Sequence, residues 1–215
     1  MHKTSHNLKQ AYIEKKAEIR KRLDDFKKVI AHGSDNKLFE ELAFCICTAG
    51  ASAKMGLRSV DAMRETLPSG SLKSLQRKLD GVHRFPNARP IYIVHTREYL
   101  KREHNFKIKE LLKSFRDPLE RRDFLAMNKD IKGIGYKESS HFLRNIGFSG
   151  YAILDKHILN TLYELKIIKN PKPPTTRDKY LEIESKLKVF ADTVDINIDE
   201  LDLLLWSEKT GEILK

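Results

Sequence analysis

Apolar residues recur at roughly helical spacing along most of this chain. The first helix is marked by Leu8, Ile13, Ile19, Leu23, Phe26 and Ile30. Gly33 is placed to end that helix. The same spacing predicts helices near residues 36–48, 53–66 and 71–79. A further helix is expected to run through Tyr92, Val94 and Leu100.

Residues that favour a helix N-terminus predict where the later helices begin. Asp117, Asp155 and Thr176 are N-cap residue types, and Asp117 is followed by proline at the first helical position. The run Asn197-Ile198-Asp199-Glu200 fits the pattern of a capping box. No segment reads as a convincing strand, and we find no internal repeat. The predicted fold class is all-α.

The charge of the chain is strongly uneven. The net charge is +11 over 215 residues, a length that allows one domain or two small ones. Residues 51–150 hold 21 basic and 11 acidic residues, whereas residues 151–215 are slightly acidic. A basic face of this kind attracts polyanions such as nucleic acids. The alternative is a set of solvated, lysine-rich helices without a partner.

Other function classes receive no support from the composition. No apolar run is long enough to span a membrane, and no signal peptide is recognisable. Cys45 and Cys47 are the only cysteines, and their spacing on a helix makes them point apart. We expect them to be core thiols in a reducing, cytosolic compartment. Two cysteines cannot hold an iron–sulfur cluster alone, and no zinc pattern is present.

The most informative segment is Ile131–Lys137, which reads as a Gly-x-Gly hairpin between two helices. Gly133 and Gly135 would let backbone N–H groups approach a phosphate oxygen, helped by the dipole of the following helix. Such contacts position a protein on nucleic acid without reading its sequence. The alternative is a tight turn between helices that has no ligand.

Two residues near the hairpin can carry chemistry. Lys137 is expected in the first turn of a helix, where the dipole disfavours a charged amine. A neutral amine is the form that Schiff-base chemistry requires. Asp155 is a good N-cap, and a capped carboxylate is rigid and ionised. It could accept a proton from the lysine, although capping alone would also explain it.

Three further residues are candidates for contact with nucleic acid. His157 is interpreted as a structural or phosphate-contacting residue. Trp206 is the only tryptophan, and it serves either as a core residue or as a partly exposed stacking surface. Phe85 lies between Arg84 and Pro86, and core packing and base stacking both suit it.

These residues together resemble a known family. The block Lys132–Gly147, with Asp155-Lys156-His157 after it, resembles the helix–hairpin–helix DNA glycosylase superfamily. With Arg84-Phe85 upstream and the tail from Trp206 to Lys215, the chain more specifically resembles the archaeal-type 8-oxoguanine DNA glycosylase/AP lyases. The resemblance runs from about residue 35 to the end of the sequence.

The resemblance implies an all-α, two-lobed fold that binds DNA in the cleft between its lobes. One lobe would comprise residues 36–147, with the hairpin near 131–137. The other would comprise residues 1–35 and 148–215.

The resemblance also implies a role for each site residue. Lys137 would be the nucleophile and Asp155 the catalytic carboxylate. Phe85 and Trp206 would sandwich the flipped base, and the C-terminal carboxylate on Lys215 would contact it.

The chemistry implied by the resemblance needs no metal and no organic cofactor. The expected partner is double-stranded DNA that contains 8-oxoguanine. We expect a cytoplasmic, nucleoid-associated monomer that does not bind a membrane. Two alternatives stay open: a non-catalytic helix–hairpin–helix DNA-binding module, and a glycosylase for another damaged base.

Overall fold

The computed structural model describes the backbone of residues 2–213 and the side chains of residues 7–213. Within this range the chain forms helices and no strands, which confirms the all-α prediction. The helices are α1 (His2–His32), α2 (Asp35–Thr48), α3 (Ala53–Met63), α4 (Leu72–Leu79), α5 (Ala88–His104), α6 (Ile108–Ser114), α7 (Pro118–Met127), α8 (Tyr136–Asn145), α9 (Lys156–Glu164), α10 (Arg177–Val194) and α11 (Ile198–Thr210).

The predicted N-caps are confirmed by side-chain hydrogen bonds. Asp117 accepts from the Leu119 N–H at 2.9 Å, and Asp155 accepts from the Ile158 N–H at 2.8 Å. Thr176 accepts from the Lys179 N–H at 3.3 Å. Each bond satisfies one of the donors that a helix start leaves without an intrahelical partner.

Two local predictions need correction. Asn197 does cap α11, through the Asp199 N–H at 2.9 Å, but Glu200 does not complete a capping box. Its carboxylate instead binds Arg20 and Tyr12 of α1, because a tertiary partner competes successfully for it. Helix α6 was not predicted, since it spans seven residues and buries only Ile108 and Leu112.

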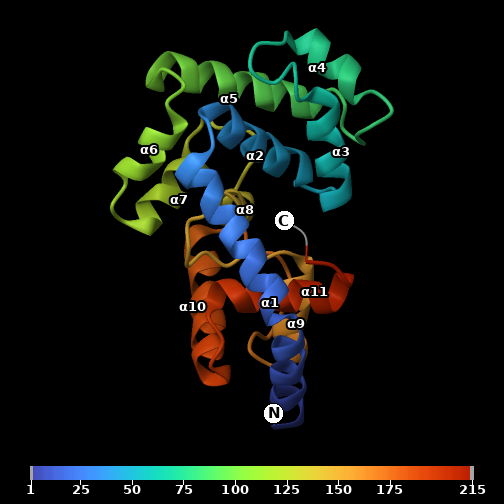
Figure 1. The fold of residues 1–215 in the computed structure, drawn as a ribbon, viewed down its shortest axis with the longest axis vertical. Coiled ribbons are helices and arrows are strands. Elements are labelled where there is room, and N and C mark those ends of the chain that lie inside the picture. Colours follow the sequence, from blue (N-terminus) through green and yellow to red (C-terminus); the bar gives the residue numbers. More distant parts are fainter. Residues whose placement is uncertain (1, 214–215) are drawn as a thin grey trace.

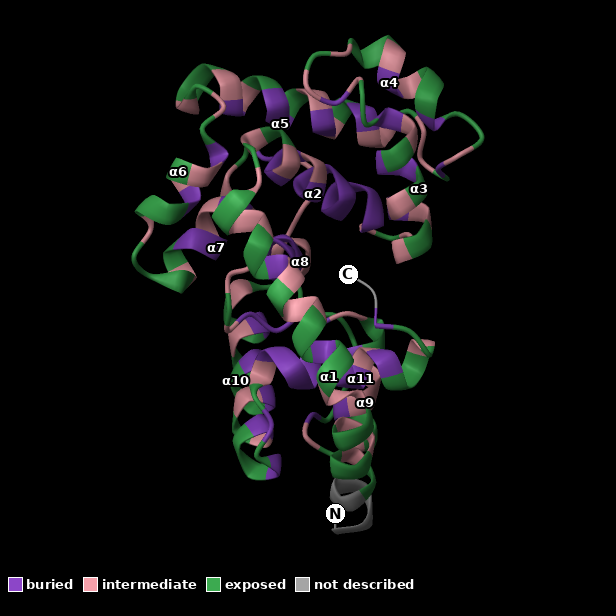
Figure 2. Cartoon of the chain, in the orientation of Figure 1, coloured by how far each residue is buried: buried purple, intermediate pink, exposed green. Residues whose placement is uncertain are grey.

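The buried residues form two hydrophobic clusters, one above the other in Figure 1. The first draws mainly on α2 to α8, and the second on α1, α9, α10 and α11. Figure 2 shows the buried positions concentrated on the faces that these helices turn toward each other. Helix α1 spans both clusters, because Ile19 and Phe26 lie in the second while Val29 and Ile30 pack against the first.

Helix α8 lies where the two clusters meet (Figure 1). Phe142 and Leu143 of this helix are fully buried in the first cluster. The chain leaves α8 through Gly147, whose φ of +102° suits glycine. A Cβ atom there would lie 2.6 Å from Cα of Lys27, so glycine also permits the close approach of α1.

Two further sequence-based expectations concern the cysteines and membrane-spanning helices. Cys45 and Cys47 are buried and not disulfide-bonded, which confirms that they are core thiols. Burial raises the pKa of the Cys47 thiol to about 12. Among the described residues, no helix combines the length and apolarity needed to cross a membrane. The division into lobes at residues 36 and 148 stays a prediction.

Candidate active site

A cavity of about 1180 Å³ lies between the two hydrophobic clusters. The end of α2 and the start of α8 form one side of it, and the start of α9 and the inner face of α11 form the other. Five of the predicted site residues line it: Gly135, Lys137, Asp155, His157 and Trp206. Residues separated by up to 71 positions in the sequence therefore share one cavity.

The hairpin brings Lys137 to the cavity wall. Gly133 has a φ of +81°, and a Cβ atom there would meet the Tyr92 ring at 2.6 Å, so this position requires glycine. Gly135 is the N-cap of α8 and has an extended backbone that any residue can adopt. Lys137 is the second residue of α8, and its side chain is 27% exposed.

Glu138 engages both the hairpin and the lysine. Its carboxylate accepts from the Gly135 N–H at 3.3 Å, and its other oxygen lies 3.6 Å from the Lys137 amine. One of the hairpin donors that the sequence pattern offers to a phosphate is thus bound by an internal carboxylate. Glu138 was not among the residues predicted from the sequence.

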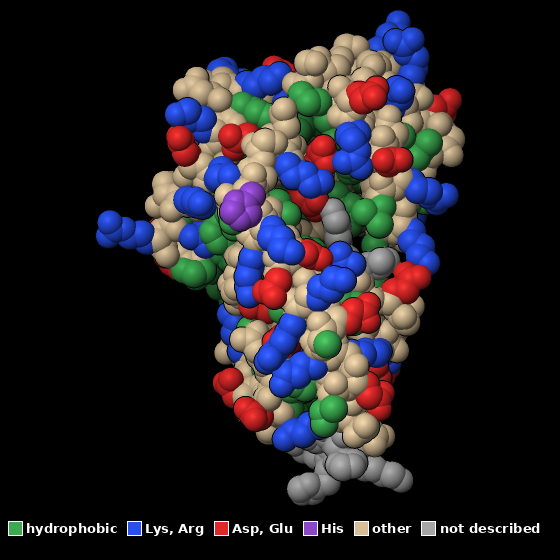
Figure 3. All heavy atoms as spheres, viewed as in Figure 1, with side chains coloured by type: hydrophobic (Ala, Val, Ile, Leu, Met, Phe, Trp, Pro, Cys, Tyr) green, Lys and Arg blue, Asp and Glu red, His purple; other side chains and the backbone are tan. Residues whose placement is uncertain are grey.

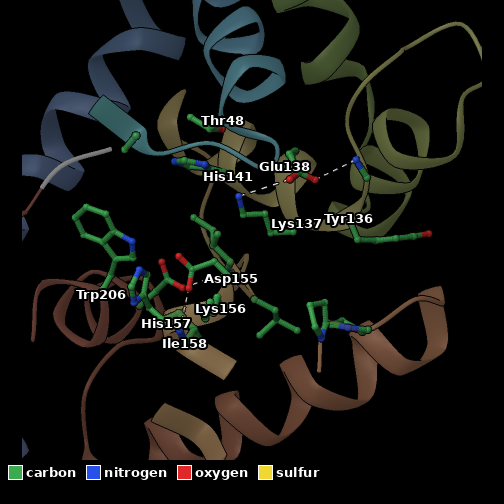
Figure 4. A pocket seen from close by; sticks show the side chains of 18 of the residues that line it. Thr48, Tyr136, Lys137, Glu138, His141, Asp155, Lys156, His157, Ile158 and Trp206 are labelled. Carbon is green, nitrogen blue, oxygen red and sulfur yellow. Dashed lines mark hydrogen bonds and ion pairs between the residues drawn. The ribbon is translucent and has the colours of Figure 1, made fainter. Parts of the chain in front are cut away.

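Asp155 faces Lys137 across the cavity. Its carboxylate caps α9, which holds the side chain in a fixed orientation. Figure 4 shows the Lys137 amine and the Asp155 carboxylate pointing into the same space from opposite sides. The same view places Trp206 and His157 beside Asp155. His157 is exposed and Trp206 is partly buried, so both side chains remain accessible from the cavity.

Phe85, Gly133 and Lys215 lie apart from this group. Phe85 is not in the cavity lining, and its ring packs under the guanidinium groups of Arg84 at 4.6 Å and Arg89 at 5.1 Å. Gly133 supports the hairpin from behind, against Tyr92. Lys215 lies outside the described residues.

A buried ion pair forms the floor of the cavity. Arg144 of α8 and Asp202 of α11 both line it and are joined at 2.7 Å, with side chains that are 4% and 2% exposed. Burial raises the pKa of the Asp202 carboxyl and lowers the pKa of the Arg144 guanidinium. Sequence reasoning missed both residues. A signal was present, because Asp202 is the only charged residue in the apolar run Leu201–Leu205.

The start of α8 also carries an aromatic hydroxyl. Tyr136 donates to Asp123 at 2.8 Å, and Asp123 in turn accepts twice from Arg177 of α10. Burial and the Asp123 carboxylate raise the pKa of the Tyr136 hydroxyl to about 12. This hydroxyl therefore stays protonated at neutral pH and acts as a structural donor.

The surface around the site carries many positive charges. On the face shown in Figure 3, lysine and arginine side chains form a band along α1, with acidic side chains among them. Several of these cations are paired locally, for example Lys27 with Asp24 and Lys28 with Asp25. Such exposed pairs contribute little to stability, and their cations stay available to a polyanion.

The arrangement suits covalent catalysis on a substrate that enters the cavity. An amine and a fixed carboxylate face one another, and neither is fully buried. The carboxylate can take a proton from the amine and offset positive charge on a reacting carbon. Among residues 7–213 there is no group of three His, Cys, Asp or Glu side chains that could hold a metal ion.

Comparisons with known proteins agree on one family. A family model described as 8-oxoguanine DNA glycosylase matches residues 19–196. The 8-oxoguanine DNA glycosylase/AP lyase of Methanocaldococcus jannaschii is 40% identical over 198 residues, which cover 92% of this chain and 91% of that protein. The protein of the same name from Fusobacterium nucleatum is 34% identical over 211 residues and covers 97% and 96%.

Solved structures of such proteins have the same fold. The M. jannaschii 8-oxoguanine glycosylase/lyase, in complex with a 15mer DNA containing 8-oxoguanine, superposes with a TM-score of 0.90 at 37% identity and 99% coverage of both chains. The 8-oxoguanine DNA glycosylase of Thermotoga maritima gives a TM-score of 0.90 at 34% identity over the full length of both chains.

Proposed function

This chain belongs to the 8-oxoguanine DNA glycosylase family, and we propose that it excises 8-oxoguanine from double-stranded DNA and cleaves the strand at the abasic site. The observation that carries this proposal is the pairing of Lys137 with Asp155 across one cavity, next to a helix–hairpin–helix. An enzyme that acts on a base in duplex DNA must first take that base out of the stack. The cavity between the two clusters is open enough to receive it.

Lys137 is proposed as the nucleophile and Asp155 as its partner. The neutral amine attacks C1′ of the damaged nucleotide, the bond from C1′ to the base breaks, and the base leaves with the bonding electrons. Asp155 offsets positive charge at C1′ and accepts a proton from the attacking nitrogen. The departing base takes up a proton from water. The sugar ring then opens: the C1′–O4′ bond breaks, the nitrogen lone pair forms the C1′=N bond, and O4′ takes the proton that Asp155 had accepted. The product is a protonated Schiff base between Lys137 and the opened sugar.

Strand cleavage follows from the same intermediate. The Schiff base makes the C2′ protons acidic, so one is removed and the 3′ phosphate leaves by β-elimination. Water then hydrolyses the Schiff base and frees the lysine. Every step uses groups of this chain, DNA and water.

The recognition residues are proposed from the resemblance, and position supports one of them. Trp206 lies in the cavity wall and offers a stacking surface. Phe85, which lies outside the cavity lining, is proposed as the second aromatic from the resemblance alone. Glu212, near the end of the described chain, lines the cavity and pairs with Lys54 of α3 at 3.0 Å. The described part of the chain therefore reaches the cavity at Glu212, and this supports the proposal, made from the resemblance, that the Lys215 carboxylate contacts the N–H edge of the base.

The remaining contacts concern the DNA backbone. Gly133, Gly135 and His157 are proposed to contact phosphates, and the net charge of +11 supports salt-dependent binding. We also propose that the protein acts as a monomer at the nucleoid in the cytoplasm.

Borohydride trapping tests the function directly. Duplex with one 8-oxoguanine is incubated with the protein and borohydride, and a covalent adduct is expected that is absent with undamaged duplex. Lesion binding without an adduct would identify a non-catalytic binding module. Trapping only on a pre-formed abasic site would assign the enzyme to another damaged base.

A further inference from the structure

The segment that delivers Asp155 to the cavity is held by side chains instead of by a helix or sheet. Residues 150–154 are largely buried and lie between α8 and α9. Buried backbone N–H groups need partners. Four of them donate to side chains of α10 and α11: Gly150 to Asp199 at 2.9 Å, Ala152 to Glu184 at 3.0 Å, Ile153 to Asp202 at 3.0 Å and Leu154 to Tyr180 at 3.3 Å.

One of these acceptors also binds the helix that carries the lysine. The second oxygen of Asp202 accepts from Arg144 of α8 at 2.7 Å. Arg144 follows Lys137 by seven residues, so the two side chains lie on the same face of α8, two turns apart. A continuous chain of contacts therefore runs from the helix of Lys137 through Arg144, Asp202 and Ile153 to Asp155.

The same design occurs a second time. Glu184 accepts from the Ala152 N–H and binds both terminal nitrogens of Arg122, which belongs to α7 on the other side of the hairpin. The Arg122 and Glu184 side chains are 3% and 6% exposed. Both helices of the helix–hairpin–helix are thus tied to the segment before Asp155.

The Asp202 carboxylate is engaged on both oxygens and almost completely buried. This argues for action through the protein and against direct contact with a substrate. Stability is a weak explanation for such a pair, since apolar residues of similar volume commonly stabilise a fold as well as a buried ion pair does.

We propose that the Arg144–Asp202 pair is a positioning device that fixes the Asp155 carboxylate relative to the Lys137 amine. This inference rests on the proposed roles of Lys137 and Asp155. Groups that react must be held close to their productive geometry, and a displacement of about 1 Å can slow a reaction about 100-fold. The pair supplies this constraint across the non-helical segment 150–154, which leads to Asp155.

Asp202→Asn is the first test. Asparagine keeps an oxygen for the Ile153 N–H but loses the ion pair with Arg144. We expect single-turnover excision of 8-oxoguanine to slow about 100-fold, with duplex affinity changed less than threefold. Glu200→Gln is the matched control, because Glu200 is a buried carboxylate of α11 that binds α1 and not the segment 150–154. It should excise at the wild-type rate.

A second variant separates positioning from folding. Asp202→Asn leaves the Arg144 charge buried without its partner, which destabilises proteins. The double variant Arg144→Met/Asp202→Asn removes both charges, and thermal unfolding should show a transition close to that of the wild type. It should still excise slowly. Wild-type excision by this double variant would overturn the proposal.

Combination with Asp155→Asn gives the sharpest readout. If Asp202 acts through Asp155, Asp155→Asn/Asp202→Asn should be no slower than Asp155→Asn alone, since the positioned group is already gone. Multiplication of the two losses would show that Asp202 acts independently and would overturn the inference. Failure of the proposed function has a different signature, since the wild type itself would then form no borohydride adduct.

Discussion

Two helix starts face each other across the cavity, and they are built in opposite ways. Helix α8 begins after Gly135, which has no side chain to cap it. Helix α9 begins after Asp155, whose carboxylate binds the Ile158 N–H. At the first start, backbone donors and the positive end of the dipole are left to other anions, and Glu138 uses one of them. At the second, the capping group is itself the candidate catalytic group.

The difference separates binding from chemistry. We propose that the start of α8, whose N-cap residue has no side chain, attracts phosphate and holds DNA in place. At the start of α9 the Ile158 N–H donates to Asp155, and this hydrogen bond holds the Asp155 carboxylate in one orientation. Lys137 belongs to the first start and Asp155 to the second, so the proposed reaction requires the two helix starts to keep a fixed position relative to each other.

Removal of the nucleophile should have the largest effect. Lys137→Gln is expected to bind 8-oxoguanine duplex but to give no borohydride adduct and no cleavage, since glutamine has no nucleophilic amine. Lys132→Gln is the matched control, because it changes the other lysine of the hairpin and should still trap. Persistent trapping by Lys137→Gln would reveal a different nucleophile.

The second-largest effect is expected when the Asp155 carboxylate, at the start of α9, is replaced by a neutral amide. Asp155→Asn should slow single-turnover excision by about 100- to 10,000-fold, the range that general acid–base groups supply. Asparagine is an equally good N-cap, so the free energy of unfolding should change by less than about 1 kcal/mol. Asp117→Asn makes the same exchange at the start of α7 and should leave excision intact. A near-normal rate in Asp155→Asn would reduce that residue to a cap.

The rate of excision should depend on pH, because the Arg144–Asp202 pair is proposed to fix the start of α9 relative to the start of α8. The pKa of the Asp202 carboxyl is raised to about 7, mainly by burial and also by Asp155 and Asp199, while Arg144 and the Ile153 N–H oppose the rise. Asp202 pairs with Arg144 only when deprotonated, so excision should rise as pH increases through about 7 and fall as pH decreases. Asp202→Asn cannot titrate, and its profile should stay near the low-pH level of the wild type. A wild-type profile in this variant would exclude Asp202 as the origin.

Substitution of the two hairpin glycines should have different effects: loss of stability at Gly133 and loss of DNA binding at Gly135. Gly133→Ala forces a side chain into a positive φ and against Tyr92, and we expect a loss of about 1–2 kcal/mol or more in the free energy of unfolding. At Gly135 a Cβ atom would meet only Glu138, at 3.8 Å, so Gly135→Val should preserve most of the stability. It should weaken binding to damaged and undamaged duplex equally. Selective loss for damaged duplex would contradict a phosphate contact.

The smallest effect is expected at the internal carboxylate of the hairpin. Glu138→Gln keeps an acceptor for the Gly135 N–H but removes a negative charge from the end of the hairpin that is proposed to bind phosphate. We expect duplex affinity to rise about two- to fivefold at low salt, in line with a charge pair of up to about 1 kcal/mol. Glu120→Gln removes an exposed charge from the first turn of α7 and gives the baseline. Unchanged affinity would place the phosphate elsewhere.

Local sequence signals predicted most of the fold and singled out Lys137 and Asp155, the two proposed catalytic groups, which the structure brings to one cavity. The caps at Asp117, Asp155 and Thr176 formed as predicted, because a cap involves residues two or three positions apart. The hairpin likewise placed Lys137 in the first turn of α8. Prediction failed where a short element or a distant partner decided the outcome, as with α6 and with Glu200, which left its capping box for α1.

The sequence by itself determined the helical class, the helix starts and the presence of a lysine and an aspartate with suitable chemistry. Each of these depends on contacts within about one helical turn, which the order of residues specifies directly. Only the tertiary structure decided that Arg144 meets Asp202, 58 residues further along the chain, and that their pairing underlies the cavity. Burial makes such a pair consequential, because a charge removed from water depends on its partner, and burial is a property of the packed fold.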